Sequence, residues 1–169
     1  MKVREVVSNA AAVAAVGALL WLMYMSVGCA ARVKDGSRPA TPYEQALAWN
    51  AILANANESA AEAVIALNES GDVGDGFTAA VTAENFRIAA WNKELTLILQ
   101  RGPDYARSQT AVIADLLARI DQAARRLIDS GQLGIKSPER QETVADQLTT
   151  VVTLAQQIAV ALRQAGVLR

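Results

Sequence analysis

The sequence predicts an all-α protein, namely an antiparallel up-down four-helix bundle preceded by an N-terminal membrane or signal helix. Two observations predict the bundle: apolar residues recur at spacings of three and four over most of the chain, and clusters of Gly and Pro divide that pattern into four segments. A third, the uncharged apolar run over residues 10–27, predicts the preceding helix. Alanine and this run raise the hydrophobic share to 52% of the 169 residues, above that of ordinary globular proteins.

The first 28 residues have the form of a signal peptide or a membrane anchor. A short start with two basic residues precedes the apolar run, which is about as long as a bilayer-spanning helix must be. The run ends in Ser26-Val27-Gly28-Cys29, which resembles the lipobox of bacterial prolipoproteins. In that family a small residue precedes a cysteine that is acylated and becomes the new N-terminus. The resemblance implies cleavage between Gly28 and Cys29 and lipidation of Cys29, although Ser26 stands where the family usually has an aliphatic residue.

The resemblance also implies a location. A lipoprotein of this kind is held in the bacterial cell envelope by its acyl chains, with its domain on the periplasmic face. Ala30 would be the second mature residue. Because an aspartate at that position commonly signals retention in the inner membrane, Ala30 points to the outer membrane of a Gram-negative cell. The form of the whole chain is similar to that of small helical lipoproteins of bacterial and prophage genomes.

A different interpretation of the same segment stays open. Residues 1–28 could remain in the protein as a single transmembrane helix, which would make the chain a subunit of a larger membrane or virion complex. Gly17 and the neighbouring small residues Ala14, Ala15 and Ala18 would let such a helix pack closely against others. Basic residues lie on both sides of the run, so the positive-inside rule does not fix its orientation.

Residues 29–40 form the lipid attachment site and a polar linker, and residues 41–169 form the helical domain. The first helix begins at Thr41-Pro42-Tyr43-Glu44, where Thr41 and Glu44 have the spacing of a capping box and Pro42 suits the first helical position. It extends to about Ser70, before three glycines within residues 71–76. Its predicted buried stripe consists of Trp49, Leu53, Ala56, Ala60, Ala63 and Leu67.

Three further helices follow. The second begins between Phe77 and Thr82 and ends before Gly102, the third covers about residues 104–130, and the fourth runs from Ser137-Pro138-Glu139 to Gly166. Their predicted stripes are, in order, Val81, Ile88, Trp91, Leu95 and Ile98; Tyr105, Gln109, Val112, Leu116, Ile120, Ala123 and Leu127; and Val144, Leu148, Val151, Ala155, Ile158 and Leu162. Short connections between similar helices favour the up-down order. Such seams also form coiled coils, so a homo-oligomer stays an alternative.

Composition excludes several kinds of chemistry. A formal net charge of −1 provides no basic surface for nucleic acid. The chain has no His and a single Cys, and its methionines all precede Cys29, so we expect no metal, no cofactor and no catalytic residue. Glu58 and Glu62 lack the histidine partners of a di-iron bundle. Residues 72–76 are glycine-rich and read as a turn rather than a complete calcium loop.

Trp49 and Trp91 are the largest side chains of the domain. Core packing is the simpler interpretation of both, and the functional interpretation is an exposed aromatic anchor for a partner. Asn50, Asn55 and Asn57 are unusual inside a helix, and we expect them on the surface. The sequence thus favours a non-enzymatic envelope protein that acts by contact with an unidentified protein. A small-ligand carrier or an enzyme would need a pocket between the helices.

Overall fold

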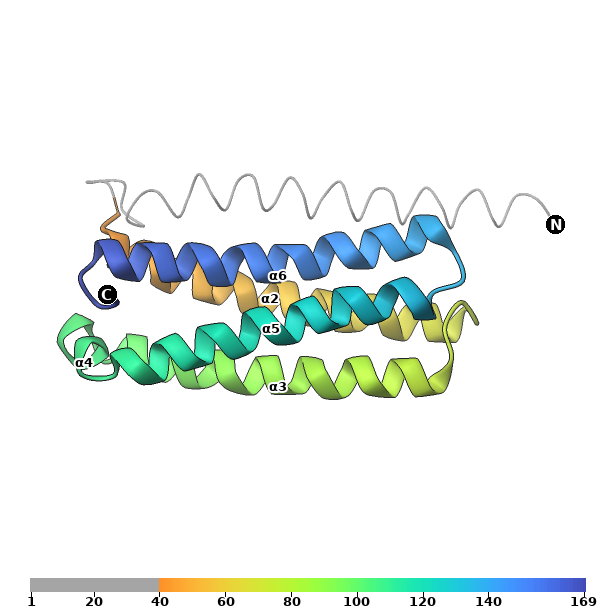
Figure 1. Ribbon diagram of the computed structural model, residues 1–169, viewed down its shortest axis with the longest axis horizontal. Coiled ribbons are helices and arrows are strands. Elements are labelled where there is room, and N and C mark those ends of the chain that lie inside the picture. Colours follow the sequence, from red (N-terminus) through yellow and green to blue (C-terminus); the bar gives the residue numbers. More distant parts are fainter. Residues whose placement is uncertain (1–39) are drawn as a thin grey trace. The chain divides into compact units, whose positions relative to one another are not determined.

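The computed structural model describes residues 40–169, apart from the side chains of residues 131–133. Within that range every regular element is a helix, which confirms the all-α class (Figure 1). The elements are α2 (Pro42–Glu69), α3 (Asp75–Gln100), α4 (Pro103–Ser108), α5 (Thr110–Gly134) and α6 (Pro138–Gln164). None of these described helices is both long enough and apolar enough to cross a bilayer. The predicted signal or membrane helix, with Gly28 and Cys29, lies outside the described residues.

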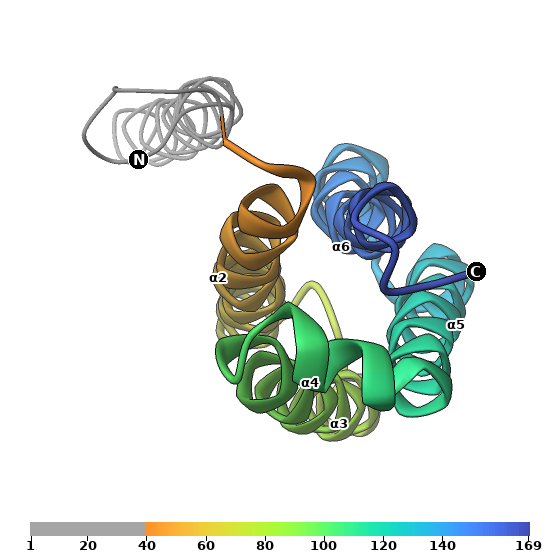
Figure 2. The same cartoon turned by 90° about the vertical axis from the view of Figure 1, so that its left-hand side faces the viewer.

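The four long helices lie side by side and alternate in direction along the chain (Figure 1). Seen from the end, they form a ring in the order α2, α3, α5, α6, and α6 packs against α2 to close it (Figure 2). The short α4 crosses from the end of α3 to the start of α5 (Figure 2). Each long helix therefore buries one stripe against two neighbours, as the predicted periodicity requires.

The first helix starts where the sequence predicts it. The backbone N–H of Glu44 donates to Thr41 Oγ1 at 3.3 Å, and the backbone N–H of Thr41 donates to Glu44 Oε2 at 2.8 Å. Both halves of the capping box are thus formed, with Pro42 at the first helical position. The helix ends at Glu69, and Gly71 adopts a φ of +76°, a conformation that side-chain-bearing residues rarely take, so the chain turns there.

The predicted third helix is wrong in one respect, because the chain forms two helices there. Gln109 leaves helical geometry (φ −109°, ψ 20°) and separates α4 from α5. Next to this break Val112, predicted to be buried, is 37% exposed while Ile113 is completely buried; the rest of the predicted stripe, from Leu116 to Leu127, is buried as expected. The other end also differs: the helix continues past residue 130 and Gly131 and ends at Gly134. Glycine weakens a helix without forbidding it.

The core consists mainly of the aliphatic residues that the periodicity predicts. The stripe of α6 is buried throughout, and Leu53 of α2 and Ile88 of α3 are inaccessible to solvent. Buried alanines on α2 and α6, such as Ala60 and Ala155, leave room for these two helices to approach closely. Complete burial of a Leu or Ile side chain stabilises the fold by about 1.5–3 kcal/mol. The largest completely enclosed side chains are Leu53, Ile88, Leu95, Leu99, Ile113, Ile120, Leu148, Ile158 and Leu162.

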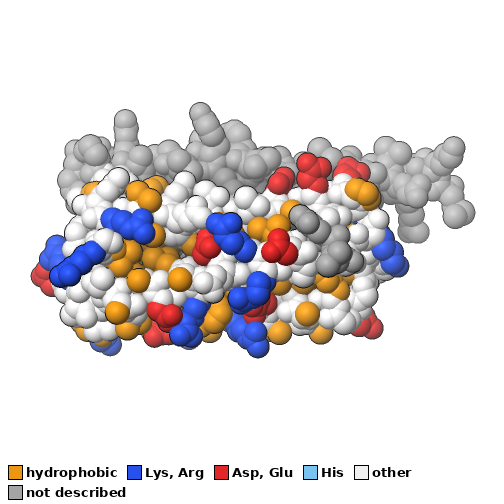
Figure 3. All heavy atoms as spheres, in the orientation of Figure 1, with side chains coloured by type: hydrophobic (Ala, Val, Ile, Leu, Met, Phe, Trp, Pro, Cys, Tyr) orange, Lys and Arg blue, Asp and Glu red, His pale blue; other side chains and the backbone are white. Residues whose placement is uncertain are grey.

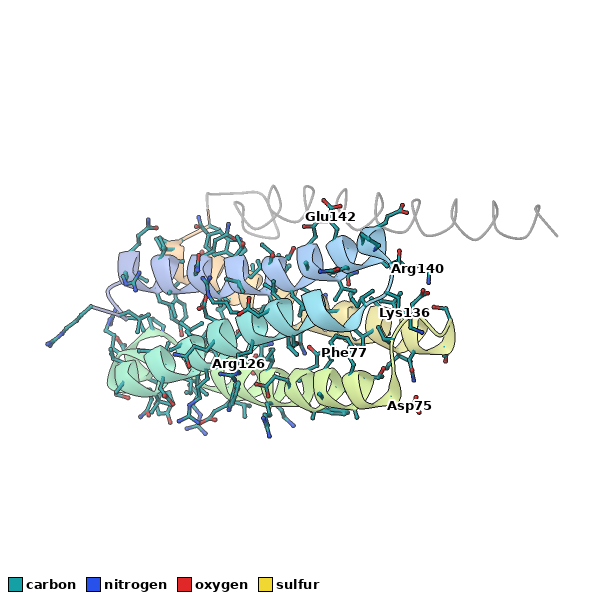
Figure 4. The ribbon with its side chains drawn as sticks, turned by 45° about the vertical axis from the view of Figure 1, so that its right-hand side comes forward. Asp75, Phe77, Arg126, Lys136, Arg140 and Glu142 are labelled. Atoms are coloured by element: carbon teal, nitrogen blue, oxygen red, sulfur yellow. The ribbon has the colours of Figure 1, made fainter. Side chains whose placement is uncertain are left out.

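The α2–α3 turn and the α5–α6 turn meet at one end of the bundle (Figure 4). The backbone N–H of Lys136 donates to the carbonyl oxygen of Asp72 at 3.1 Å, and Lys136 Nζ donates to the carbonyl oxygen of Gly71 at 2.9 Å. Arg140 forms an ion pair with the Asp72 carboxylate. Residues 72–74 therefore belong to a structural turn, residues 75 and 76 begin α3, and Asp72 holds the two hairpins together.

The surface shown in Figure 3 is formed by α6, α5 and α3, and side chains of both charge signs are interspersed on it. On α5, Arg119 Nε lies 2.7 Å from Asp115 Oδ2, and Arg125 Nε lies 2.8 Å from Asp121 Oδ2. In both pairs the partners are four residues apart, which places them next to each other on the helix surface. Exposed pairs of this kind contribute little to stability.

Candidate functional site

A groove that is large enough for a ligand runs between α2 and α3. Its volume is about 540 Å³, within the range of about 300–1,000 Å³ that is typical of ligand sites. We call it the α2–α3 groove. It is lined by Ala54, Asn57, Glu58, Ala61 and Ile65 of α2 and by Thr82, Asn85, Phe86, Ala89, Asn92, Lys93 and Thr96 of α3.

Four buried asparagines lie along the contact between α2 and α3. Asn50 and Asn57 are seven residues apart on α2, and Asn85 and Asn92 are seven apart on α3. All four are at most 4% exposed. Two helical turns separate residues seven apart, so each pair lies on one face of its helix. The prediction that Asn50 and Asn57 lie on the surface is wrong, because α3 covers the face that carries them; Asn55 is exposed as expected.

Hydrogen bonds fix the antiparallel register of these asparagines. Asn57 Nδ2 donates to the backbone carbonyl oxygen of Asn85 at 3.0 Å, and Asn92 Nδ2 donates to that of Asn50 at 3.4 Å. Asn50 Nδ2 also donates to Thr96 Oγ1 at 2.6 Å. Asn57 thus lies opposite Asn85, and Asn50 lies opposite Asn92. A shift of either helix by one turn would break these bonds, so the asparagines specify the register of this helix pair.

Several polar atoms of the groove floor have no hydrogen-bond partner among the described residues. They are Oδ1 of Asn57, Oδ1 of Asn92, and both Nδ2 and Oδ1 of Asn85. A buried polar group left unpaired costs about 1–3 kcal/mol, so such groups are rare unless a ligand or water satisfies them. Asn85 is the most unusual of the three, because its entire carboxamide is unpaired although the residue is only 3% exposed.

The walls of the groove are mainly apolar and made of small side chains. The short side chains of Ala54, Ala61 and Ala89 project little from the walls. Two larger side chains are exposed to solvent, Phe86 by 72% and Ile65 by 44%. An aromatic ring with so much accessible surface is unusual in a protein with few aromatic residues. Exposed apolar side chains beside a concave surface are typical of a site that binds another molecule.

Charged residues surround the groove but do not line its floor. Glu58 lies on the α2 wall and Lys93 on the α3 wall. Glu84, next to Asn85 in sequence, serves a different contact: it accepts from Arg126 Nη2 of α5 at 2.6 Å and from Arg87 Nη1 at 2.7 Å. The hydrogen bond from Arg126 lowers the pKa of Glu84 below its usual range, burial opposes this effect, and the bond from Arg87 reinforces it. Glu84 therefore holds α3 against α5 beside the groove.

The tryptophans predicted as partner-binding residues are not part of this groove. Trp49 and Trp91 are both half-buried. Their exposure is thus intermediate between that of a core residue and that of an exposed anchor, the two interpretations given above. Neither lines the groove. The indole N–H of Trp49 is buried without a hydrogen-bond partner among the described residues. Glu58, considered above as a metal ligand, lines the groove. Within residues 40–169, however, no three acidic side chains lie close enough together to hold a metal ion.

The sequence contained a signal for the buried asparagines of α2, which the predicted stripe omitted. Asn50 and Asn57 share the three-four periodicity of Leu53 and Ala60, and a polar residue that follows an apolar period is a candidate for a buried polar seam.

Comparisons with protein-family models, curated proteins and solved structures gave no match to this chain. The groove therefore has to be interpreted from its own geometry and chemistry.

Proposed function

We propose that this chain is a lipid-anchored protein of the bacterial cell envelope, whose antiparallel four-helix bundle binds another protein through the α2–α3 groove and catalyses no reaction. The observation that carries the binding role is the groove itself, in which an unpaired Asn85 carboxamide lies beside an exposed Phe86. The anchoring role rests on the likeness of Ser26-Val27-Gly28-Cys29 to a lipobox.

In this proposal the signal peptide ends at Gly28, and acyl chains on Cys29 hold the protein in the membrane, in the outer membrane of a Gram-negative cell. One acyl chain binds a bilayer only marginally, whereas two or three anchor a protein stably. Residues 29–40 tether the bundle at the periplasmic face, where envelope proteins are available as partners. The occupant is a protein, and neither nucleic acid nor a cofactor has a role.

The anchoring is tested by the intact mass of the protein extracted from bacterial membranes, with and without an inhibitor of lipoprotein signal peptidase. We expect a mass that lacks Met1–Gly28 and includes acyl chains on Cys29, and the inhibitor should block this processing. The variant Cys29→Ser should remain unprocessed and serves as the matched control. A full-length chain with an unmodified Cys29 would refute the lipoprotein.

That second result would favour the alternative, a single-pass subunit of a larger membrane or virion complex. The apolar run over residues 10–27 is long enough for this role, and Ser26 is the lipobox position that departs from the family. The groove would then bind another subunit of the same complex. A small-ligand carrier is a second alternative, supported by the groove volume of about 540 Å³.

The binding role is tested by a photo-crosslinking amino acid placed at Phe86 of the full chain in its native membrane. We expect one discrete protein adduct from this position. The control is the same amino acid at Ala118, an exposed residue of α5 outside the groove. Adducts of equal yield and pattern at both positions, or none at Phe86, would contradict binding through the groove.

A further inference from the structure

We infer that the occupant of the α2–α3 groove is a single amphipathic helix of the partner, with an amide or hydroxyl side chain at the centre of its apolar stripe. This inference rests on the proposed function of the groove and specifies the chemistry of the partner. It follows from the length of the groove, the spacing of its lining residues, the unpaired amide in its floor and the positions of its two charges.

The groove has the length of a short helix. Its lining residues extend from Ala54 to Ile65 on α2 and from Thr82 to Thr96 on α3. At 1.5 Å per residue, these stretches measure about 16 Å and about 21 Å. A helix of three to four turns has the same length, because one turn rises about 5.4 Å.

The lining residues also have the spacing of a helix-binding surface. On α2 they include Ala54, Glu58, Ala61 and Ile65, and on α3 they include Thr82, Phe86, Ala89 and Lys93. Both sets repeat at intervals of four, three and four, so each forms a straight stripe along its helix. Two such stripes side by side form a trough, in which the small alanines admit a third helix and the larger side chains pack between its residues.

The unpaired amide distinguishes a helix from other occupants. An extended peptide or a sugar chain presents polar groups along its whole length, but the buried polar atoms of this groove that have no partner among the described residues belong only to Asn57, Asn85 and Asn92. A helix satisfies its own backbone hydrogen bonds and needs a partner only for individual side chains. The Asn85 carboxamide is closed to solvent in the free bundle and offers both donors and an acceptor, so a turn of this side chain toward the groove would let it pair with Asn, Gln, Ser or Thr on the incoming helix. A purely apolar helix would leave these groups unpaired.

The two wall charges define the direction of the incoming helix. Asn57 lies opposite Asn85, so Glu58 lies opposite Glu84, nine residues from Lys93. This separation is about 13 Å along the groove. A basic residue facing Glu58 and an acidic residue about nine positions away, facing Lys93, would complement both charges. The reverse orientation would place like charges together.

The test uses two fluorescent helical peptides and the full chain in lipid nanodiscs. Both peptides carry the same Ala and Leu stripe over four turns, with a Lys and a Glu placed to face Glu58 and Lys93. The central stripe position is Asn in one peptide and Leu in the other. Fluorescence anisotropy should show the Asn peptide binding at least tenfold more tightly than the Leu peptide. A peptide with Lys and Glu exchanged should bind more weakly than the Asn peptide.

Three variants assign the binding to the groove. Phe86→Asp should abolish binding of both peptides, whereas Leu97→Asp, at a residue of α3 that is 55% exposed and outside the groove, should leave it unchanged. Asn85→Leu should retain binding and lose the preference for the Asn peptide. Circular dichroism and sedimentation of each variant separate loss of the groove from loss of the fold.

Several results would overturn the inference. A helix of this chemistry would be excluded if the Asn and Leu peptides bound with equal affinity, or if neither peptide bound. It would also be excluded if Asn85→Leu still preferred the Asn peptide. A dimer of the free protein that Phe86→Asp abolishes would identify the occupant as a second copy. If the peptides fail while the crosslink from Phe86 persists, only this inference fails. If both fail, the proposed function fails with it.

Discussion

Replacement of Asn85 by Leu should make the protein more stable, which is an unusual expectation for a buried residue. Both polar groups of the Asn85 carboxamide are unpaired at 3% exposure. The hydrogen bond that Asn85 accepts from Asn57 Nδ2 goes to its backbone oxygen, so the substitution leaves it intact. Leucine has no polar group to bury and also has the higher helix propensity.

The magnitude follows from two opposing terms. Removing the two unpaired polar groups should raise the free energy of unfolding by about 1–3 kcal/mol for each group. Any hydrogen bond that such a group already makes with water reduces this gain. The larger Leu side chain could overpack its site, which costs about 1–3 kcal/mol in a closed core. At Asn85 this second term should be small, since Leu branches at the same carbon as Asn and the residue borders the groove of about 540 Å³. We expect a net gain of about 1–2 kcal/mol, a rise in melting temperature of about 3–8 °C for a domain of this size.

Urea unfolding of residues 41–169, followed by tryptophan fluorescence and circular dichroism, measures this effect. Asn50→Leu is the matched control, because Asn50 donates to Thr96 Oγ1 at 2.6 Å and does not line the groove. Asn50→Leu should be neutral or destabilising, since it loses the hydrogen bond to Thr96 and places a larger side chain in a closed part of the core. A loss of 1 kcal/mol or more in Asn85→Leu would refute the reasoning: the carboxamide would then have partners within the bundle, and the groove floor would need no ligand.

Three further substitutions test the bundle around the groove. Glu84→Gln should destabilise by about 1–2 kcal/mol at pH 7, because Glu84 binds Arg126 at 2.6 Å. The pKa of Glu84 is lowered in the folded state, so its contribution to stability is complete above the usual carboxyl range and disappears as the pH falls through the lowered pKa. The difference in stability between Glu84→Gln and the wild type should therefore shrink in acid. Gly134→Ala should destabilise by about 1–3 kcal/mol, because the added Cβ would collide with the Phe77 ring; Leu53→Ala, at a completely buried position, should cost about 2–5 kcal/mol. Chemical unfolding measures all three.

Matched controls accompany these substitutions. Glu62→Gln, at an exposed residue of α2, should change stability little at either pH. Gly76→Ala, where an added Cβ meets no atom within 4 Å, should raise stability by about 0.4–1 kcal/mol through the lower entropy of the unfolded chain. A Glu84→Gln difference that is unchanged in acid would argue against the role of its charge, and a stabilised Gly134→Ala would argue against the contact with Phe77.

The opposite effects expected for Asn85 link stability to function. If Asn85→Leu stabilises the free bundle and also removes the preference for a polar helix, the carboxamide is retained for binding at the expense of folding. Sites that serve ligands commonly break a rule of core packing in this way. Glu84 provides the contrast, since its two arginine contacts lie within the bundle and its replacement should weaken folding only.

Features decided by neighbouring residues could be predicted from the sequence. The capping box of Thr41 and Glu44 joins residues three apart, so its geometry depends only on the local helix start. The buried stripe of α6 follows from helical periodicity, and every member predicted is buried. The break at Gln109 was not predicted, because the apolar period continues across it while the chain turns from α4 into α5.

The amino-acid sequence by itself determined the all-α class, the approximate helices and the absence of histidine and of any cysteine besides Cys29. The tertiary structure decided which side of each helix became a site. Periodicity shows that a face is buried but not which helix covers it, so Asn50 and Asn57 looked like surface residues until α3 was packed over them. The groove exists only because the antiparallel register brings Asn57 opposite Asn85, about thirty residues away along the chain.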